Sequence, residues 1–144
     1  MNNQFSLWLI NNSFLLAEIF GAKNILLDDI NWQSIVIKNF ELPPYWRQLY
    51  SRLKIVFPTR GRGLVIPPDK FYLDLGLRTV RGKIPEHYFE RDYFNDLYSK
   101  GWARYSFHIK NGWKPSMIVR EGTNLVNVLD MLHDAMFKAA RDTK

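Results

Sequence analysis

Residues Gly101 to Met131 read GWARYSFHIKNGWKPSMIVREGTNLVNVLDM, and they carry the most informative pattern in the chain. In residues 102–109 two sets of side chains alternate, which is typical of a strand with one buried face. A Trp-x-Pro corner at Trp113 and Pro115 follows, and an amphipathic segment comes after it. The stretch therefore predicts a strand, a fixed corner and a closing helix.

The predicted closing helix begins after Thr123 or Asn124, because both residue types cap helix N-termini. Its apolar side chains recur at three- and four-residue spacing and form one stripe: Leu125, Val128, Leu129, Leu132 and Met136. Such a stripe predicts a helix that packs on another element and leaves its polar side in water.

Upstream of the corner, the sequence predicts one more helix and several short strands. Residues 5–22 have apolar side chains at helical spacing, with Ser13 as the cap of a second helical piece that stops at Gly21. Alternating Val, Ile and aromatic residues, broken by double prolines, predict extended segments at 30–40, 49–57, 64–66 and 71–73. The predicted class is α+β: an N-terminal helix, an antiparallel meander of about four strands, a long irregular loop over 78–100 and a C-terminal helix.

The composition describes a globular chain. Its 144 residues are 47% hydrophobic, which suits a single domain over 1–144. The chain has no cysteine, which excludes disulfides, thiolate metal sites and thiol nucleophiles, and no other residues show metal-ligand spacing. We therefore expect no metal and no cofactor. Polar residues interrupt the N-terminal apolar runs, so we expect neither a signal peptide nor a membrane span, and a cytoplasmic location.

Positive charge is concentrated in one window. Nine basic residues lie between Arg47 and Lys83, against the acidic Asp69 and Asp74. Such a field favours an acidic partner, either a protein or a nucleic acid. One hypothesis is therefore a nucleic-acid-binding module that uses this window and its interleaved Tyr and Trp rings. The alternative is that these residues form an ordinary solvated surface.

Ser106 and His108 are the candidates for chemistry, because on a strand they would point the same way. Acyl transfer needs a nucleophile, a proton acceptor and donors aimed at the developing oxyanion, and these two residues could supply the first two. The Cβ atoms of an i, i+2 pair on a strand lie roughly 6 to 7 Å apart, so a direct hydrogen bond requires a bulge. The alternative is that Ser106 is an ordinary strand residue and His108 a structural histidine. His87 is expected to be exposed.

The order of these features resembles the ubiquitin-conjugating-enzyme-like (UBC-like) superfamily. The segment GWARYSFHIKNGWKP, followed by NLVNVLDML, is most similar to the bacterial branch called prokaryotic family E. The resemblance implies a UBC-like fold and a role in a bacterial ubiquitin-like conjugation pathway, for which antiphage defence is the suggested process. It also implies two partners, an activating-enzyme-like protein and a ubiquitin-like modifier. The first helix and the turns at Pro43–Pro44 and Pro67–Pro68 are expected to contact the activating enzyme.

The chain departs from the superfamily pattern at the catalytic position. Eukaryotic members carry a catalytic cysteine at the place of Tyr105 and Ser106, preceded by His-Pro-Asn. Here no cysteine is present, and Tyr93-Phe94-Asn95 stands at the place of that tripeptide. The resemblance implies that Asn95 could stabilise an oxyanion. Two versions stay open: a noncanonical transferase that carries the modifier as an oxyester on Ser106, and a catalytically inactive adaptor.

Overall fold

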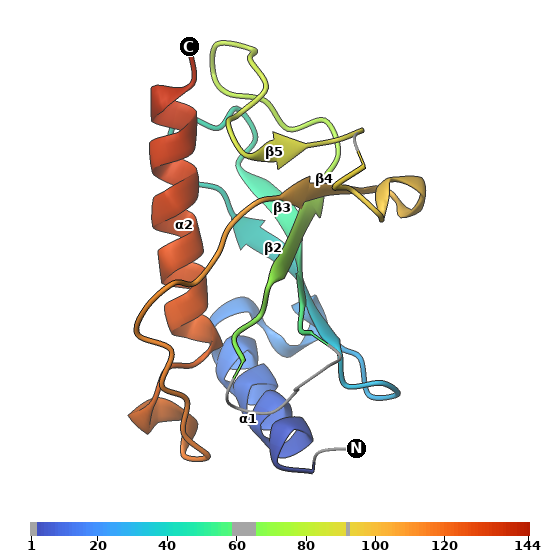
Figure 1. Cartoon of the computed structure of the whole chain (residues 1–144), viewed down its shortest axis with the longest axis vertical. Coiled ribbons are helices and arrows are strands. Elements are labelled where there is room, and N and C mark those ends of the chain that lie inside the picture. Colours follow the sequence, from blue (N-terminus) through green and yellow to red (C-terminus); the bar gives the residue numbers. More distant parts are fainter. Residues whose placement is uncertain (1–2, 59–65, 92) are drawn as a thin grey trace.

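The computed structural model, which describes residues 3–58, 66–91 and 93–144, has a six-stranded antiparallel sheet and two long helices, one near each end of the chain (Figure 1). The helices are α1 (Asn3–Phe20) and α2 (Leu125–Asp142), with short 3-10 turns η1 (Ala22–Asn24), η2 (Tyr98–Lys100) and η3 (Val119–Glu121). The strands are β1 (Ile25–Leu27), β2 (Ser34–Glu41), β3 (Tyr50–Val56), β4 (Lys70–Asp74), β5 (Tyr88–Phe89) and β6 (Trp102–Tyr105). Their order across the sheet is β1-β2-β3-β4-β6-β5. The predicted α+β class is confirmed.

Helix α1 runs unbroken and ends before Gly21, whose φ of 91° lies in the left-handed region. The Ser13 hydroxyl donates to the carbonyl of Ile10 at 2.6 Å, which places Ser13 inside the helix. The prediction that Ser13 caps a second helical piece is therefore wrong. Local bonding of a serine to the preceding turn is a common alternative to capping.

The predicted meander is present as β1 to β4, which pair antiparallel in sequence order. Strands β2, β3 and β4 lie at the segments predicted over 30–40, 49–57 and 71–73, but residues 30–33 precede β2 and are not part of a strand. The meander has four strands, as predicted, although its very short first strand β1 was not predicted. The sheet has six strands among the described residues, because it also contains β6, from the strand predicted over 102–109, and the very short β5, which was not predicted. Of the extended segment predicted at 64–66, residues 64 and 65 lie outside the described residues.

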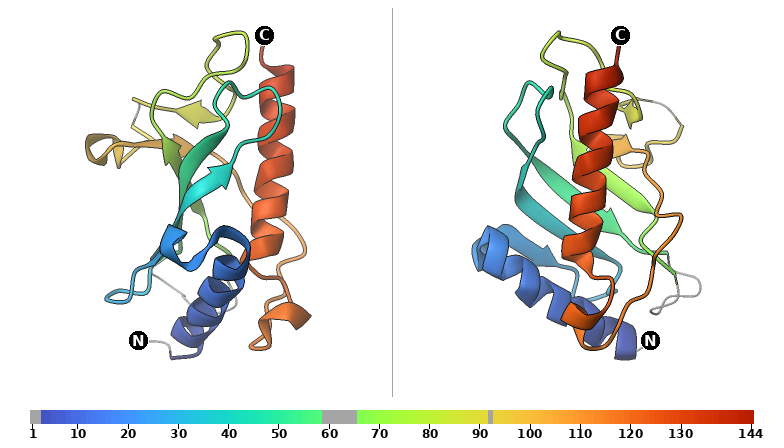
Figure 2. Two further views of the ribbon diagram at one scale, coloured as in Figure 1. Left: turned by 180° about the vertical axis from the view of Figure 1, so that it is seen from behind. Right: turned by 90° about the vertical axis from the view of Figure 1, so that its left-hand side faces the viewer.

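The inner face of the sheet packs against α2, which crosses it in the right-hand view of Figure 2. All five residues of the predicted helix stripe are buried, so that prediction is confirmed. They meet the inward residues of the strands, which alternate with outward ones: Leu53 and Ile55 of β3, Phe71 and Leu73 of β4, and Ala103 and Tyr105 of β6. Each such side chain contributes roughly 1.5 to 3 kcal/mol by leaving water.

The Trp-x-Pro corner is tied to the start of α2. Asn124 is the cap of α2, and its side chain accepts from Asn127 N in a capping box. Thr123 N donates to the carbonyl of Lys114, and Lys114 N donates back to the Thr123 hydroxyl, each at 2.9 Å. The ring of Trp113 meets that of Trp8 on α1 edge to face, with centroids 5.7 Å apart. The corner therefore sets the position of both helices.

Helix α1 is also bonded to α2 through a buried side chain. Asn12 is fully buried, its Nδ2 donates to the carbonyl of Trp8 at 2.8 Å, and its Oδ1 accepts from Leu125 N at 2.7 Å. The first free N–H of α2 is thereby satisfied by α1.

Three buried tyrosines predict a loss of stability at alkaline pH. Burial is the main cause that raises the pKa of Tyr72, Tyr88 and Tyr105 above the ordinary value near 10. The folded state therefore keeps phenol protons that the unfolded state loses, and the free energy of unfolding should fall as the pH rises above about 10.

Urea titrations between about pH 9 and pH 12 would measure this loss. Tyr105→Phe is the test variant, because replacing either of the other two tyrosines would also remove a hydrogen bond. The Tyr72 hydroxyl donates to Asp96, and the Tyr88 hydroxyl donates to the carbonyl of Asp74. We expect Tyr105→Phe to lose less stability than the wild type over this range. Equal slopes for the two proteins would contradict the prediction.

Candidate functional site

Ser106 lies immediately after β6, which is the neighbour of the edge strand β5. Its N–H donates to the carbonyl of His87 at 2.9 Å, so the β5–β6 pairing continues for one residue. In the alternation of β6, Ser106 follows Trp102 and Arg104 onto the outer face, the face turned away from α2. There it lines a hollow of about 230 Å³, the outer hollow, with Phe89, Phe94 and Arg104.

A second hollow lies between Ser106 and α2. This helix-side hollow has a volume of about 310 Å³ and contains four charged or titratable side chains: Glu86, His87, Lys138 and Asp142. His87 has a φ of 68°, unusual for a residue other than glycine, and its ring lies 6.5 Å from that of Tyr105. His87 is exposed, as predicted, but its proximity to Ser106 was not predicted.

His108 is not brought to Ser106. Strand β6 ends at Tyr105 and not at Ile109, so the strand prediction is wrong for 106–109 and the alternation no longer places the two side chains together. His108 is exposed and lines neither the outer nor the helix-side hollow. Its role in catalysis stays a prediction without geometric support.

Asn95 is buried, and its side chain is already hydrogen-bonded. Nδ2 donates to the carbonyls of Glu90 and Trp102 at 2.7 and 2.8 Å, and Oδ1 accepts from Leu97 N at 3.3 Å. Both amide protons are therefore used to fasten the loop before β6 to the strand itself. An oxyanion could be stabilised by Asn95 only if one of these bonds were given up.

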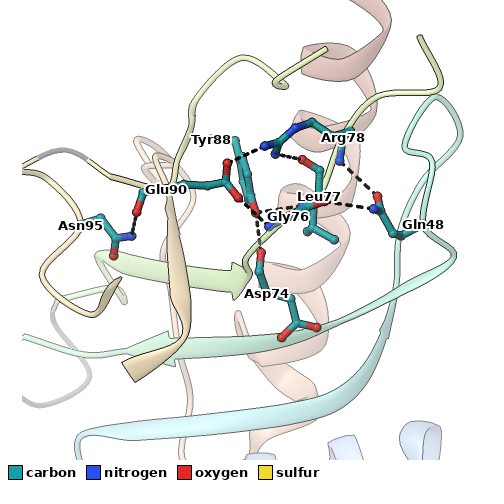
Figure 3. Close-up of polar contacts among 8 residues, drawn as sticks. All are labelled: Gln48, Asp74, Gly76, Leu77, Arg78, Tyr88, Glu90 and Asn95. Carbon is teal, nitrogen blue, oxygen red and sulfur yellow. Dashed lines mark hydrogen bonds and ion pairs between the residues drawn. The ribbon is translucent and has the colours of Figure 1, made fainter. Parts of the chain in front are cut away.

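The loop that contains Asn95 is ordered by a polar network (Figure 3). Glu90 forms an ion pair with Arg78 at 2.9 Å and accepts a hydrogen bond from Gly76 N. The side chain of Gln48 donates to the carbonyl of Gly76 and accepts from Arg78 N, each at 3.1 Å. The Tyr88 hydroxyl adds two bonds, donating to the carbonyl of Asp74 and accepting from Leu77 N. The segment predicted as an irregular loop is thus held against the ends of β3 and β4.

On the outer face, cations cover aromatic rings. The guanidinium of Arg52 lies 4.1 Å from the Trp102 ring centroid, and that of Arg104 lies 5.7 Å from the Tyr72 ring. Both rings are buried. They are therefore closed to stacking with nucleic-acid bases, which needs an open ring face. Arg60 and Arg62 of the basic window lie outside the described residues.

Only some of the residues around Ser106 could have been predicted from the sequence. Arg104 shares the predicted alternation with Ser106, so its place beside the serine follows from the strand. Phe89, Phe94 and His87 come from the segment predicted as a loop, and no sequence signal places them at the site. Their position depends on β5, a two-residue strand.

In the part of the chain that the structure describes, no group of three His, Asp or Glu side chains could hold a metal ion. Neither of the two long helices there is apolar enough to cross a bilayer. Comparisons with protein-family models, with curated proteins and with solved structures found no significant match.

Proposed function

We propose that this chain is a cysteine-less, UBC-like component of a bacterial ubiquitin-like conjugation pathway, which binds an activating-enzyme-like partner and a ubiquitin-like modifier as a non-covalent adaptor. One observation carries the proposal: α1 leads into a four-strand antiparallel meander, and a Trp-x-Pro corner then leads into α2 across the inner face of the sheet. This is the element order that the sequence resemblance implies. The suggested process, antiphage defence, rests on the resemblance alone.

The proline positions support the same proposal. Pro43 and Pro44 separate β2 from β3, Pro58 follows the buried Phe57 at the end of β3, and Pro67–Pro68 precede β4. Each break lies beside a strand of the meander, and these prolines are among the features that carry the resemblance.

Helix α1 offers a surface for the activating-enzyme-like partner. Opposite the buried Trp8, it leaves Leu7 and Phe14 largely exposed, at 53% and 66%. Large apolar side chains on one exposed helix face are typical of a surface that a partner covers.

The adaptor version fits the site better than the covalent version. Without cysteine the chain cannot form a thioester. His108 lies outside both hollows, and the amide of Asn95 is occupied, so Ser106 lacks the base and the oxyanion donor that were expected for it. An adaptor needs neither group.

The covalent version remains the second candidate, because Ser106 lines a hollow. In that version the Ser106 hydroxyl oxygen attacks the carbonyl carbon of the modifier's C-terminal thioester on the partner. A C–O bond forms, the C–S bond breaks, and the departing thiolate takes the serine proton.

A reconstitution separates the two versions. The protein is mixed with the activating-enzyme-like protein, the ubiquitin-like modifier and ATP, and then analysed by size-exclusion chromatography and denaturing electrophoresis. The adaptor version predicts co-elution without an adduct, with retention unchanged in Ser106→Ala. The covalent version predicts an adduct that hydroxylamine cleaves and thiols do not, lost in Ser106→Ala and kept in the control Ser116→Ala.

Absence of both co-elution and adduct would contradict the proposal. In that case salt-sensitive binding to an oligonucleotide would favour the nucleic-acid alternative.

A further inference from the structure

Two adjoining turns form one end of the molecule, beside the C-terminal end of α2 (Figures 1 and 2). We call residues 42–49 and 79–85 the basic tip. Four large apolar side chains of the basic tip are exposed: Val80 at 56%, Ile84 at 58%, Leu49 at 74% and Tyr45 at 45%. Three exposed cations lie among them: Arg47, Arg81 and Lys83.

The basic tip is a fixed structure. Thr79 N donates to the carbonyl of Lys83 at 2.9 Å, and Gly82 N donates to the carbonyl of Thr79 at 2.8 Å, which closes the second turn. Val80 N donates to the carbonyl of Tyr45 at 2.9 Å, which joins the two turns. The apolar side chains are therefore held outward by backbone hydrogen bonds.

The first turn also contacts α2 and the second turn through its side chains. The Tyr45 ring lies 5.6 Å from that of Phe137 on α2. A Cβ on Gly82, which has a φ of 80°, would lie 3.0 Å from Arg47 Nη2, so the Arg47 guanidinium rests against the second turn. This places it on the same turn as Arg81 and Lys83.

The basic tip carries no acidic residue. Glu41 precedes the first turn and Glu86 follows the second, and the residues of both turns add only positive charge. Its surface is therefore complementary to an anionic partner.

We infer that the basic tip docks on an anionic membrane surface. Lys and Arg are attracted to anionic headgroups, and exposed aliphatic side chains gain by entering the boundary between headgroups and acyl chains. A phosphate backbone would use the three cations but offer nothing to Val80 and Ile84. A lipid surface uses both kinds of side chain, and it accepts protruding turns without a complementary groove. This inference does not depend on the proposed function.

Vesicle co-sedimentation tests the inference. The whole protein is incubated at low salt with vesicles of phosphatidylcholine, or of phosphatidylcholine mixed with phosphatidylglycerol. We expect binding to the mixed vesicles only, weakened by added salt. Each cation near such a surface strengthens binding about fivefold, so Arg81→Ala with Lys83→Ala should weaken it about twenty-five-fold. Val80→Ser with Ile84→Ser should weaken it severalfold at unchanged charge.

Two matched controls lie elsewhere on the surface. Ile30→Ser removes a more exposed aliphatic side chain, at 78%, from a turn next to Asp28 and Asp29, and Lys23→Ala removes an exposed cation from η1. Both should leave vesicle binding unchanged. Thermal melts of all variants should match the wild type, because the altered side chains are exposed.

Three outcomes would overturn the inference: no binding to either vesicle, equal binding to neutral and anionic vesicles, and equal losses in the control variants. Oligonucleotide binding that the tip variants abolish, without vesicle binding, would assign the same surface to nucleic acid instead.

Discussion

Gly122→Ala is expected to lower the free energy of unfolding by about 3 kcal/mol or more, because a side chain has no room at the corner. A Cβ at this position would lie 2.5 Å from Ser116 N, 2.6 Å from Lys114 O and 2.8 Å from Pro115 C. All three are backbone atoms, which cannot move aside as a flexible side chain can. The corner would have to shift, and its hydrogen bonds with Thr123 would be lost with it.

Gly112→Ala is the matched control, since Gly112 belongs to the same corner and its carbonyl accepts from the Thr123 hydroxyl. A Cβ there would meet nothing within 4 Å, so only its φ of 80° opposes the change. We expect a cost of about 1 to 2 kcal/mol. Urea denaturation of both variants measures the difference. Equal stabilities would show that steric exclusion at Gly122 is not what holds the corner.

Trp8→Ala is expected to cost about 3 to 5 kcal/mol, which is typical of deleting a large buried ring. Trp8 has no exposed surface, and its ring contacts three others: Phe5 at 6.0 Å, Phe57 at 6.0 Å and Trp113 at 5.7 Å between centroids. These rings come from α1, from the end of β3 and from the corner. The substitution would therefore open a cavity where three separate segments meet.

The comparison for this variant is Leu7→Ala, at the neighbouring position on the exposed side of α1. We expect it to change the free energy of unfolding by less than about 0.5 kcal/mol. Chemical denaturation gives both values. A loss below about 1 kcal/mol in Trp8→Ala would contradict the assignment of this ring to the centre of the core.

The parts of the fold that sequence predicted are those with long local patterns. Helix α2 has 18 residues with one buried stripe, so its period identifies it and its packing face together. Strands β2 and β3 have eight and seven residues, each with alternating buried positions, and a proline follows each strand. The local pattern of such segments is enough to predict their conformation, and the tertiary structure does not override it.

Strand ends at the edge of the sheet were not predictable, because they depend on partners that are distant in sequence. Tyr105 pairs with Phe71 on one side and with Tyr88 on the other. Strand β4 begins at Lys70, and β5 is preceded by His87 with a φ of 68°, so both ladders end near Tyr105. The side chains of residues 106–109 still alternate in the sequence, but these residues have no strand partner in β4 or β5 and therefore do not extend β6.

The site shows the same division. Ser106 was predicted from its motif, and its place in the outer hollow follows from the outward alternation of β6. The role predicted for Asn95 came from a tripeptide position, and the hydrogen bonds that engage its amide go to the main-chain carbonyls of Glu90 and Trp102. Every residue type has a main-chain carbonyl, so the partner residues of such bonds cannot be recognised from the sequence.

The bond between Asn12 and Leu125 N joins residues 113 positions apart, and this separation bears on the order of folding. During synthesis α1 leaves the ribosome well before its helical partner α2. Until then the buried side of α1, including Trp8, lacks both α2 and the corner that complete its burial. Contacts this distant in sequence slow folding, because a long chain segment must be closed before they form. Between the synthesis of α1 and that of α2, the nascent chain therefore exposes aromatic surface of the kind that chaperones bind.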